Sequence, residues 1–150
     1  MIEIDKINSK ILLELESNGR ISNTDLAQRV GLSASACLRR VQELERTGII
    51  SGYRAKLDRS KLGGNIVVFV MVGLSEHLKK DARAFEDAMI AAPQVRECHN
   101  ITGSVEYLLR VEVSDLVSYK EFHAEVLGTQ SQVSSITSYI SLGSPKDMRA

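Results

Sequence analysis

Two adjacent arginines, Arg39 and Arg40, lie within the stretch "GLSASACLRRVQELERTGII" at residues 31–50. On a helical wheel at about 100° per residue, Cys37, Val41 and Leu44 share one apolar arc. Arg39 falls nearly opposite that arc, and Arg40 lies on its flank. A guanidinium can bond a guanine edge bidentately and can also clamp a phosphate. These arginines are therefore either solvent-facing charges on a packed helix or part of a face that binds a nucleic acid.

The exposed face of this stretch begins with small residues, which let its N-terminal end approach another surface closely. A tight turn followed by such a helix with an arginine face is typical of a helix-turn-helix, whose second helix enters the major groove. We expect Arg39 to contact base edges, and Arg40 and Arg46 to contact phosphates. The predicted DNA-binding residues are Ser33, Ser35, Ala36, Arg39, Arg40 and Arg46. Such patterns are short and degenerate, so a trihelical domain with merely solubilising arginines stays an alternative.

Three short helices must position these residues. Apolar residues recur at helical spacing through residues 1–50, and "SNGR" at 17–20 and "GLS" at 31–33 interrupt the pattern. Ser22 or Asn23 can cap the second helix, Ser33 can cap the third, and Gly48 follows the last turn of the third. We assign residues 1–50 to a winged helix-turn-helix DNA-binding domain.

After Gly48 the apolar period changes toward two. We expect an extended linker at 51–64, and then a second domain at 65–150 that binds an effector and forms oligomers. The expected strands of this domain lie at 65–74, 95–102, 105–113 and 132–142, and its helices at 79–91 and 115–127. The order βαββαβ is that of the ferredoxin-like fold, one antiparallel sheet with both helices on one side. The predicted fold class is therefore α+β.

The first of these strands is apolar on both faces, with Val68 and Val70 on one side and Val67, Phe69 and Met71 on the other. A sheet face open to water shows a clean apolar and polar alternation instead. We therefore expect the face without helices to be buried against a second copy, which predicts a homodimer. The alternative is that the N-terminal helices cover this face.

Composition limits the other classes of function. The net charge is zero, and it divides into +3 for residues 1–61 (11 Lys and Arg against 8 Asp and Glu) and −3 for the rest. The two cysteines, Cys37 and Cys98, are too few for a disulfide framework or a metal cluster, and we expect no cofactor and no metal. The chain has no apolar run of roughly 20 residues and no signal-peptide pattern, which predicts a cytoplasmic protein without a membrane partner.

The sequence resembles the Lrp/AsnC, or feast/famine, family of transcription regulators. The most specific matches are Asp5 with "ILLELESNGR", then "LAQRVGLS" and "RRVQELERTGII", and the resemblance continues through the C-terminal half. It implies a βαββαβ domain that binds small effectors, usually amino acids, and dimers that often assemble further to octamers. The partners implied are thus double-stranded DNA, an effector and further copies of this chain.

The resemblance also implies an effector loop, which here is "TGSVEY" from Thr102 to Tyr107. Gly103 and Ser104 are expected to form a two-residue hairpin turn. Glu106 stands where the family usually has aspartate and can receive an ammonium group, or it is a solvated strand residue near Arg110. The implied effector-binding residues are Gly103, Ser104, Val105, Glu106, Tyr107, Ile136 and Ser138. Ser104 and Ile136 depart from the commoner family pattern, so the effector's identity stays open.

Some relatives of this family are tetrapyrrole decarboxylases of the haem pathway, which makes an enzyme of the same fold the alternative function. That chemistry needs cationic and imidazole groups that converge on a pocket. The three histidines are His77, His99 and His123, and nothing in the sequence couples them to a nucleophile or a metal site. No glycine-rich phosphate loop is present either. We therefore favour a DNA-binding regulator over an enzyme and assign no catalytic residue.

Overall fold

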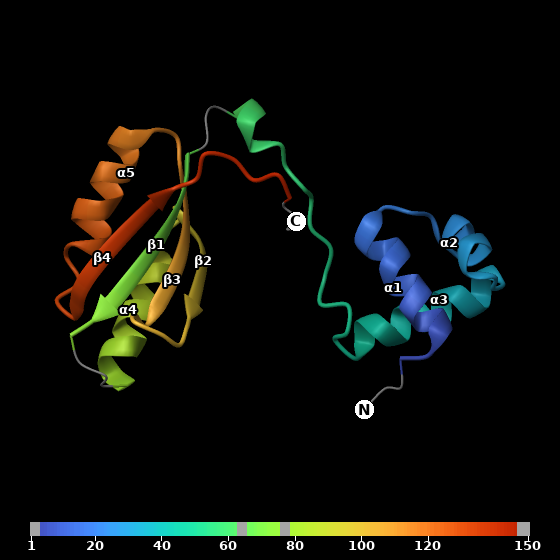
Figure 1. Ribbon diagram of the computed structural model, residues 1–150. Helices are drawn as coiled ribbons and strands as arrows, with labels where there is room; N and C mark the ends of the chain where they lie inside the picture. Colours follow the sequence, from blue (N-terminus) through green and yellow to red (C-terminus); the bar gives the residue numbers. More distant parts are fainter. Residues whose placement is uncertain (1–3, 63–65, 76–78, 147–150) are drawn as a thin grey trace. The chain divides into compact units, whose positions relative to one another are not determined.

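The computed structural model describes residues 4–62, 66–75 and 79–146, and the chain divides into two compact units between Lys56 and Leu57. The first unit is helical and the second combines a four-stranded antiparallel sheet with two helices (Figure 1). The predicted α+β class is confirmed.

Three helices build the N-terminal unit: α1 (Lys6–Ser17), α2 (Asn23–Val30) and α3 (Ala34–Arg46). Each begins at a side-chain cap that satisfies a backbone N–H which the helix itself leaves open. Asp5 caps α1, Ser22 caps α2 and Ser33 caps α3, so the predicted caps of the second and third helices are confirmed. The shared core consists of Ile11, Leu26, Ala27, Val30, Cys37 and Leu44.

A tight turn sets α3 against α2. Gly31 adopts a φ of 74°, the left-handed conformation that favours glycine, and the Leu32 N–H donates to the Ala27 carbonyl at 2.9 Å. The Asn23 side-chain amide spans the turn and donates to the Ala34 carbonyl at 2.8 Å. These two hydrogen bonds fix the direction in which the first turn of α3 leaves α2.

The chain after α3 is extended through residues 51–58, and no helix or strand is assigned there. A single 3-10 turn, η1 (Arg59–Leu62), follows within the segment for which the sequence predicted an extended linker. The difference is local, because one turn of 3-10 helix needs only a few residues and has no periodic apolar signal.

The C-terminal unit contains β1 (Ile66–Leu74), α4 (Lys79–Ala91), β2 (Val95–Asn100), β3 (Tyr107–Val113), α5 (Leu116–Phe122) and β4 (Val133–Ile140). One π-helical turn, η2 (His123–Leu127), extends α5. The strand order β2-β3-β1-β4 is that of the ferredoxin-like fold, so the predicted fold of this unit is confirmed. The strands β2, β3 and β4 are shorter than their predicted ranges, and the turn between β2 and β3 takes the ends of those two strands.

Both helices pack on the same face of the sheet (Figure 1). Phe85 and Met89 of α4 and Phe122 of α5 share one core with Val68 and Val70 of β1. Because side chains alternate along a strand, the neighbouring residues of β1 point to the other face. That open face is half-buried at Val67, Phe69 and Met71 within a single copy of the chain.

Candidate nucleic-acid interface and ligand site

The exposed side of α3 presents Arg39 to solvent. Arg39 makes no ion pair or hydrogen bond with any residue that the structure describes. Ser35, one turn earlier, is exposed as well, and its hydroxyl lies 3.3 Å from the hydroxyl of the cap residue Ser33. Gln42, one turn after Arg39, is a further exposed polar residue on this side that the sequence interpretation did not include.

Arg40 has a different environment from its neighbour. Its Nη1 donates to Asp5 Oδ2 at 2.6 Å and to Asn8 Oδ1 at 2.9 Å, so it joins α3 to the start of α1. The Asn8 N–H and the Arg40 guanidinium together lower the pKa of Asp5. We expected Arg40 to face a phosphate, but in the free protein its guanidinium is occupied by a contact between helices.

Arg46 is also paired. Its Nε and Nη2 donate to the two carboxylate oxygens of Glu43 at 2.8 and 2.7 Å. This contact lowers the pKa of Glu43 and raises the pKa of Arg46. The helical wheel correctly places Arg39 on the exposed side of α3 and Arg40 on its flank. It does not show that Arg46 is paired with Glu43.

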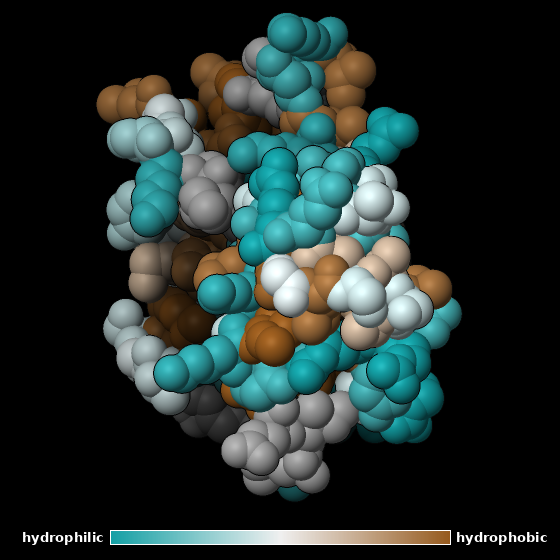
Figure 2. Space-filling view, turned by 90° about the vertical axis from the view of Figure 1, so that its right-hand side faces the viewer, coloured by the Kyte–Doolittle hydropathy of each residue, from teal (hydrophilic) through white to brown (hydrophobic). Residues whose placement is uncertain are grey.

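The surface nearest the viewer in Figure 2 is mainly hydrophilic, with smaller hydrophobic areas between the hydrophilic side chains. Leu13 of α1 and Leu38 of α3 are the exposed large apolar residues of the described helices in the N-terminal unit. Isolated exposed leucines are normal on a protein surface and indicate no binding site by themselves.

The predicted effector loop is wider than a two-residue turn. The Ile101 N–H donates to the Glu106 carbonyl at 2.8 Å, so four residues, Thr102 to Val105, form the turn between β2 and β3. Gly103 has a φ of 141° there, a conformation that side chains rarely adopt. The predicted two-residue turn is therefore wrong. A Gly-X pair fits a two-residue turn, but it also fits a longer turn that needs a glycine at another position.

Glu106 is half-buried and lies at the end of the sheet. Its Oε2 accepts a hydrogen bond from the Leu74 N–H at 2.7 Å, which ties the loop to the last residue of β1. The carboxylate lies beside Gly73, where a Cβ would collide with the Ser135 hydroxyl. A carboxylate and a hydroxyl therefore lie close together over a residue without a side chain.

Tyr107 follows Glu106 but points to the other face. It is 1% exposed, its ring centroid lies 4.8 Å from that of Phe85, and its hydroxyl donates to Glu86 Oε1 at 2.7 Å. Burial and then the Glu86 carboxylate raise the pKa of Tyr107. Tyr107 is thus a core residue that supports the loop from below.

The two predicted residues of β4 lie on the helix side too. Ile136 pairs with Val72 and packs against the core, and the Ser138 hydroxyl bonds the hydroxyl of Tyr119 on α5. Within one copy of the chain, the structure therefore does not bring Ile136 and Ser138 together with Glu106. Gly103 and Ser104 are exposed at the turn, and Val105 is half-buried.

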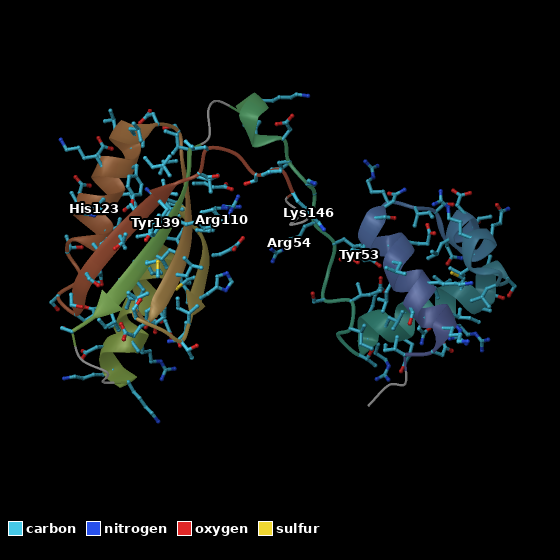
Figure 3. The ribbon with its side chains drawn as sticks, viewed as in Figure 1. Tyr53, Arg54, Arg110, His123, Tyr139 and Lys146 are labelled. Carbon is cyan, nitrogen blue, oxygen red and sulfur yellow. The ribbon has the colours of Figure 1, made fainter. Side chains whose placement is uncertain are left out.

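The open face of the sheet carries charges at its centre. Arg110 of β3 lies opposite Phe69 of β1, which in turn pairs with Tyr139 of β4; Figure 3 labels Arg110 and Tyr139. Arg110 forms an ion pair with Glu112 on the same strand, and the Arg96 guanidinium lies 3.7 Å from Glu112. The side chains of Arg110 and Glu112 are only 13% and 9% exposed, so water has little access to these two charges even in one copy of the chain.

The described histidines do not converge. His99 lies 3.2 Å from Glu97 on β2, and His123 stacks edge-on against Tyr119 of α5. His77 lies outside the described residues. No cluster of three or more metal-binding side chains occurs in the described part of the chain, and none of its helices is long and apolar enough to cross a membrane.

Two family models match the chain. Residues 4–51 match a winged helix-turn-helix DNA-binding model, and residues 67–150 match the Lrp/AsnC ligand binding domain. A leucine-responsive regulatory protein of Rhizobium meliloti is 40% identical over 146 residues, covering 97% of this chain and 94% of that protein. A Bkd operon transcriptional regulator of Pseudomonas aeruginosa is 43% identical over 144 residues, with 96% and 94% covered.

Solved structures agree over the same length. A transcriptional regulator from Neisseria meningitidis in complex with L-Met has a TM-score of 0.92 and 32% identity, covering 97% of this chain and 94% of that one. An AsnC family transcriptional regulator from Agrobacterium tumefaciens has a TM-score of 0.90 and 31% identity, with 95% and 93% covered.

Proposed function

The chain belongs to the Lrp/AsnC family of transcription regulators and carries a helix-turn-helix DNA-binding domain, and on this premise we propose how it contacts DNA. The N-terminal half of α3 enters the major groove, where Arg39 contacts a base edge and the hydroxyls of Ser33 and Ser35 lie at the groove's rim. Its target is chromosomal DNA, so we place the protein in the cytoplasm and assign it no catalytic activity.

The observation that carries this proposal is the freedom of Arg39. A guanidinium that must bond a base edge bidentately needs its donors free, and Arg39 has no partner among the described residues. Arg40, by contrast, is held by Asp5 and Asn8.

Fluorescence anisotropy with duplexes from the promoter region of its own gene tests the proposal. We expect specific binding that weakens steeply as salt rises, because phosphate contacts release counterions. If no upstream fragment binds at low salt, the proposed role of α3 is wrong.

We further propose that a small amino acid is the effector. A related regulator has been solved with L-Met, and here the Glu106 carboxylate beside the Ser135 hydroxyl offers acceptors for an ammonium group. The backbone of Gly103, Ser104 and Val105 forms the loop beside it. Tyr107 supports this loop from the core, and Ile136 and Ser138 lie on the helix side of the sheet, where they support the strands or contact the effector of another copy of the chain.

A thermal-shift screen over the proteinogenic amino acids, with L-methionine first, tests this effector. A ligand that binds only the folded state raises the unfolding midpoint by mass action. Glu106→Gln keeps an oxygen for the Leu74 N–H but removes the charge, so it should abolish the shift without unfolding the protein. Glu125→Gln, at an exposed position after α5, is the matched control. A flat response to every amino acid contradicts the proposal.

The oligomer is part of the same proposal. We infer that the open sheet face, with Phe69, Met71 and Leu108, packs against a second copy, and that these dimers assemble further, up to an octamer. Sedimentation velocity should give at least a dimer for the wild type and a smaller species for Phe69→Glu. Ile90→Glu, which changes an 80% exposed residue of α4, is the control. A monomeric wild type contradicts this interface.

A further inference from the structure

Glu43 is exposed on α3 one helical turn beyond Arg39 and so lies on the same side of the helix. DNA carries a negative charge on every phosphate, so a carboxylate on a helix that approaches DNA weakens the attraction between them. In a helix-turn-helix the N-terminal residues of the second helix meet the bases. Glu43 and Arg46 occupy the last turns of α3, away from the residues that meet the bases, which agrees with the expectation that Arg46 contacts a phosphate.

The Glu43 carboxylate occupies one complete edge of the Arg46 guanidinium. Nε and Nη2 form this edge, and each donates to a different oxygen of Glu43, at 2.8 and 2.7 Å. The same edge matches two phosphate oxygens. Arg46 therefore cannot offer that edge to a phosphate while it is paired with Glu43.

The pair can open at little cost. The two side chains are 71% and 49% exposed, and exposed ion pairs are weak. Competition between Glu43 and a phosphate for one guanidinium is thus a balanced exchange.

We propose that Glu43 limits the affinity of this regulator for non-specific DNA by competing with phosphates for Arg46. Non-specific binding comes almost entirely from neutralised phosphates, so each cation withheld from them lowers it. A lower affinity for bulk DNA leaves more of the protein free to reach its operator. This inference rests on the proposed role of α3 in DNA binding.

Glu43→Gln tests the proposal, with the affinity for a duplex of unrelated sequence as the readout. The variant should bind this duplex about two- to fivefold more tightly at moderate salt. The slope of log affinity against log salt should steepen by up to about 0.9, the value for one phosphate contact. Both gains should vanish in the double variant Glu43→Gln with Arg46→Gln, because the proposed effect passes through Arg46.

Glu45→Gln is the matched control. It makes the same charge change on the same helix, but the Glu45 carboxylate accepts a hydrogen bond from the Tyr53 hydroxyl and is not paired with Arg46. An equal gain in Glu45→Gln would show a general charge effect and overturn the proposal. A gain that persists without Arg46, or an altered base preference with unchanged non-specific affinity, overturns it as well. A wild type that binds no DNA contradicts the proposed function itself, which separates that failure from this one.

Discussion

Replacing each of the two adjacent arginines of α3 by methionine should produce opposite results. Arg40→Met keeps the aliphatic stem but removes the donors that bond Asp5 and Asn8. Asn8 is only 9% exposed, so its amide oxygen loses its partner in a place where water reaches it poorly. An unsatisfied buried acceptor costs about 1–3 kcal/mol. For a domain as small as the N-terminal unit, which ends at Lys56, each kcal/mol of lost stability lowers the unfolding midpoint by about 4–8 °C.

Arg39→Met should leave the midpoint nearly unchanged, because Arg39 has no partner among the described residues. It should instead weaken operator binding by about 1–3 kcal/mol for each copy of α3 on the operator, the usual value of one bidentate base contact, and relax sequence preference.

Circular dichroism melts and anisotropy titrations over a salt series measure both effects on the same preparations. Arg40→Met should melt lower but keep the salt slope and the sequence preference of the wild type. If it lowers the salt slope by about 0.9 with an unchanged midpoint, Arg40 is a phosphate contact and our interpretation of the helix contact is wrong. If Arg39→Met leaves sequence preference intact, another residue contacts the bases.

Three further predictions concern single side chains. The pKa of Asp5 is lowered in the folded state, so its carboxylate stabilises the fold above its ordinary pKa of 3.8. This contribution is lost as pH falls through the lowered pKa. The unfolding midpoints of the wild type and of Asp5→Asn should therefore converge in acid. Burial and the nearby Glu86 raise the pKa of Cys98 to about 11, so iodoacetamide should alkylate this thiol slowly near pH 8 and faster as pH rises; fast labelling near neutral pH would contradict this. Gly73→Ala should lower the free energy of unfolding by about 1–3 kcal/mol through overpacking, and adding Ser135→Ala should restore it, because the new Cβ collides with that hydroxyl.

The local features of the helical domain could be predicted from the sequence. Ser22 and Ser33 cap their helices and Gly31 forms the turn, because each of these signals depends on neighbours within a few residues. The bond between Arg40 and Asp5 could not be predicted, since 35 positions separate the two and no periodic pattern connects them. The wheel gave the direction of Arg40 but not the residue it meets.

The ligand site shows a different limit. Glu106 and Tyr107 are consecutive residues where a strand begins, so the period of two places them on opposite faces. That rule was available from the sequence, whereas the family resemblance grouped both residues in one loop motif. The Leu74 N–H that bonds Glu106 lies on another strand, and only the sheet register brings the two together.

The number of unpaired arginines on α3 indicates that specific DNA binding needs more than one copy of the chain. Arg40 is paired with Asp5 and Arg46 with Glu43, so each copy of α3 offers DNA one arginine, Arg39, that has no partner among the described residues. One bidentate base contact is worth about 1–3 kcal/mol, which is far less than the roughly 4–10 kcal/mol that separates specific from non-specific binding. Two copies of α3 on half-sites about one helical turn apart would combine their contacts through a high effective concentration. A variant that separates the copies, such as Phe69→Glu, should therefore lose more operator affinity than Arg39→Met, although Phe69 touches no DNA in our proposal. Equal losses would mean that a single copy carries the recognition.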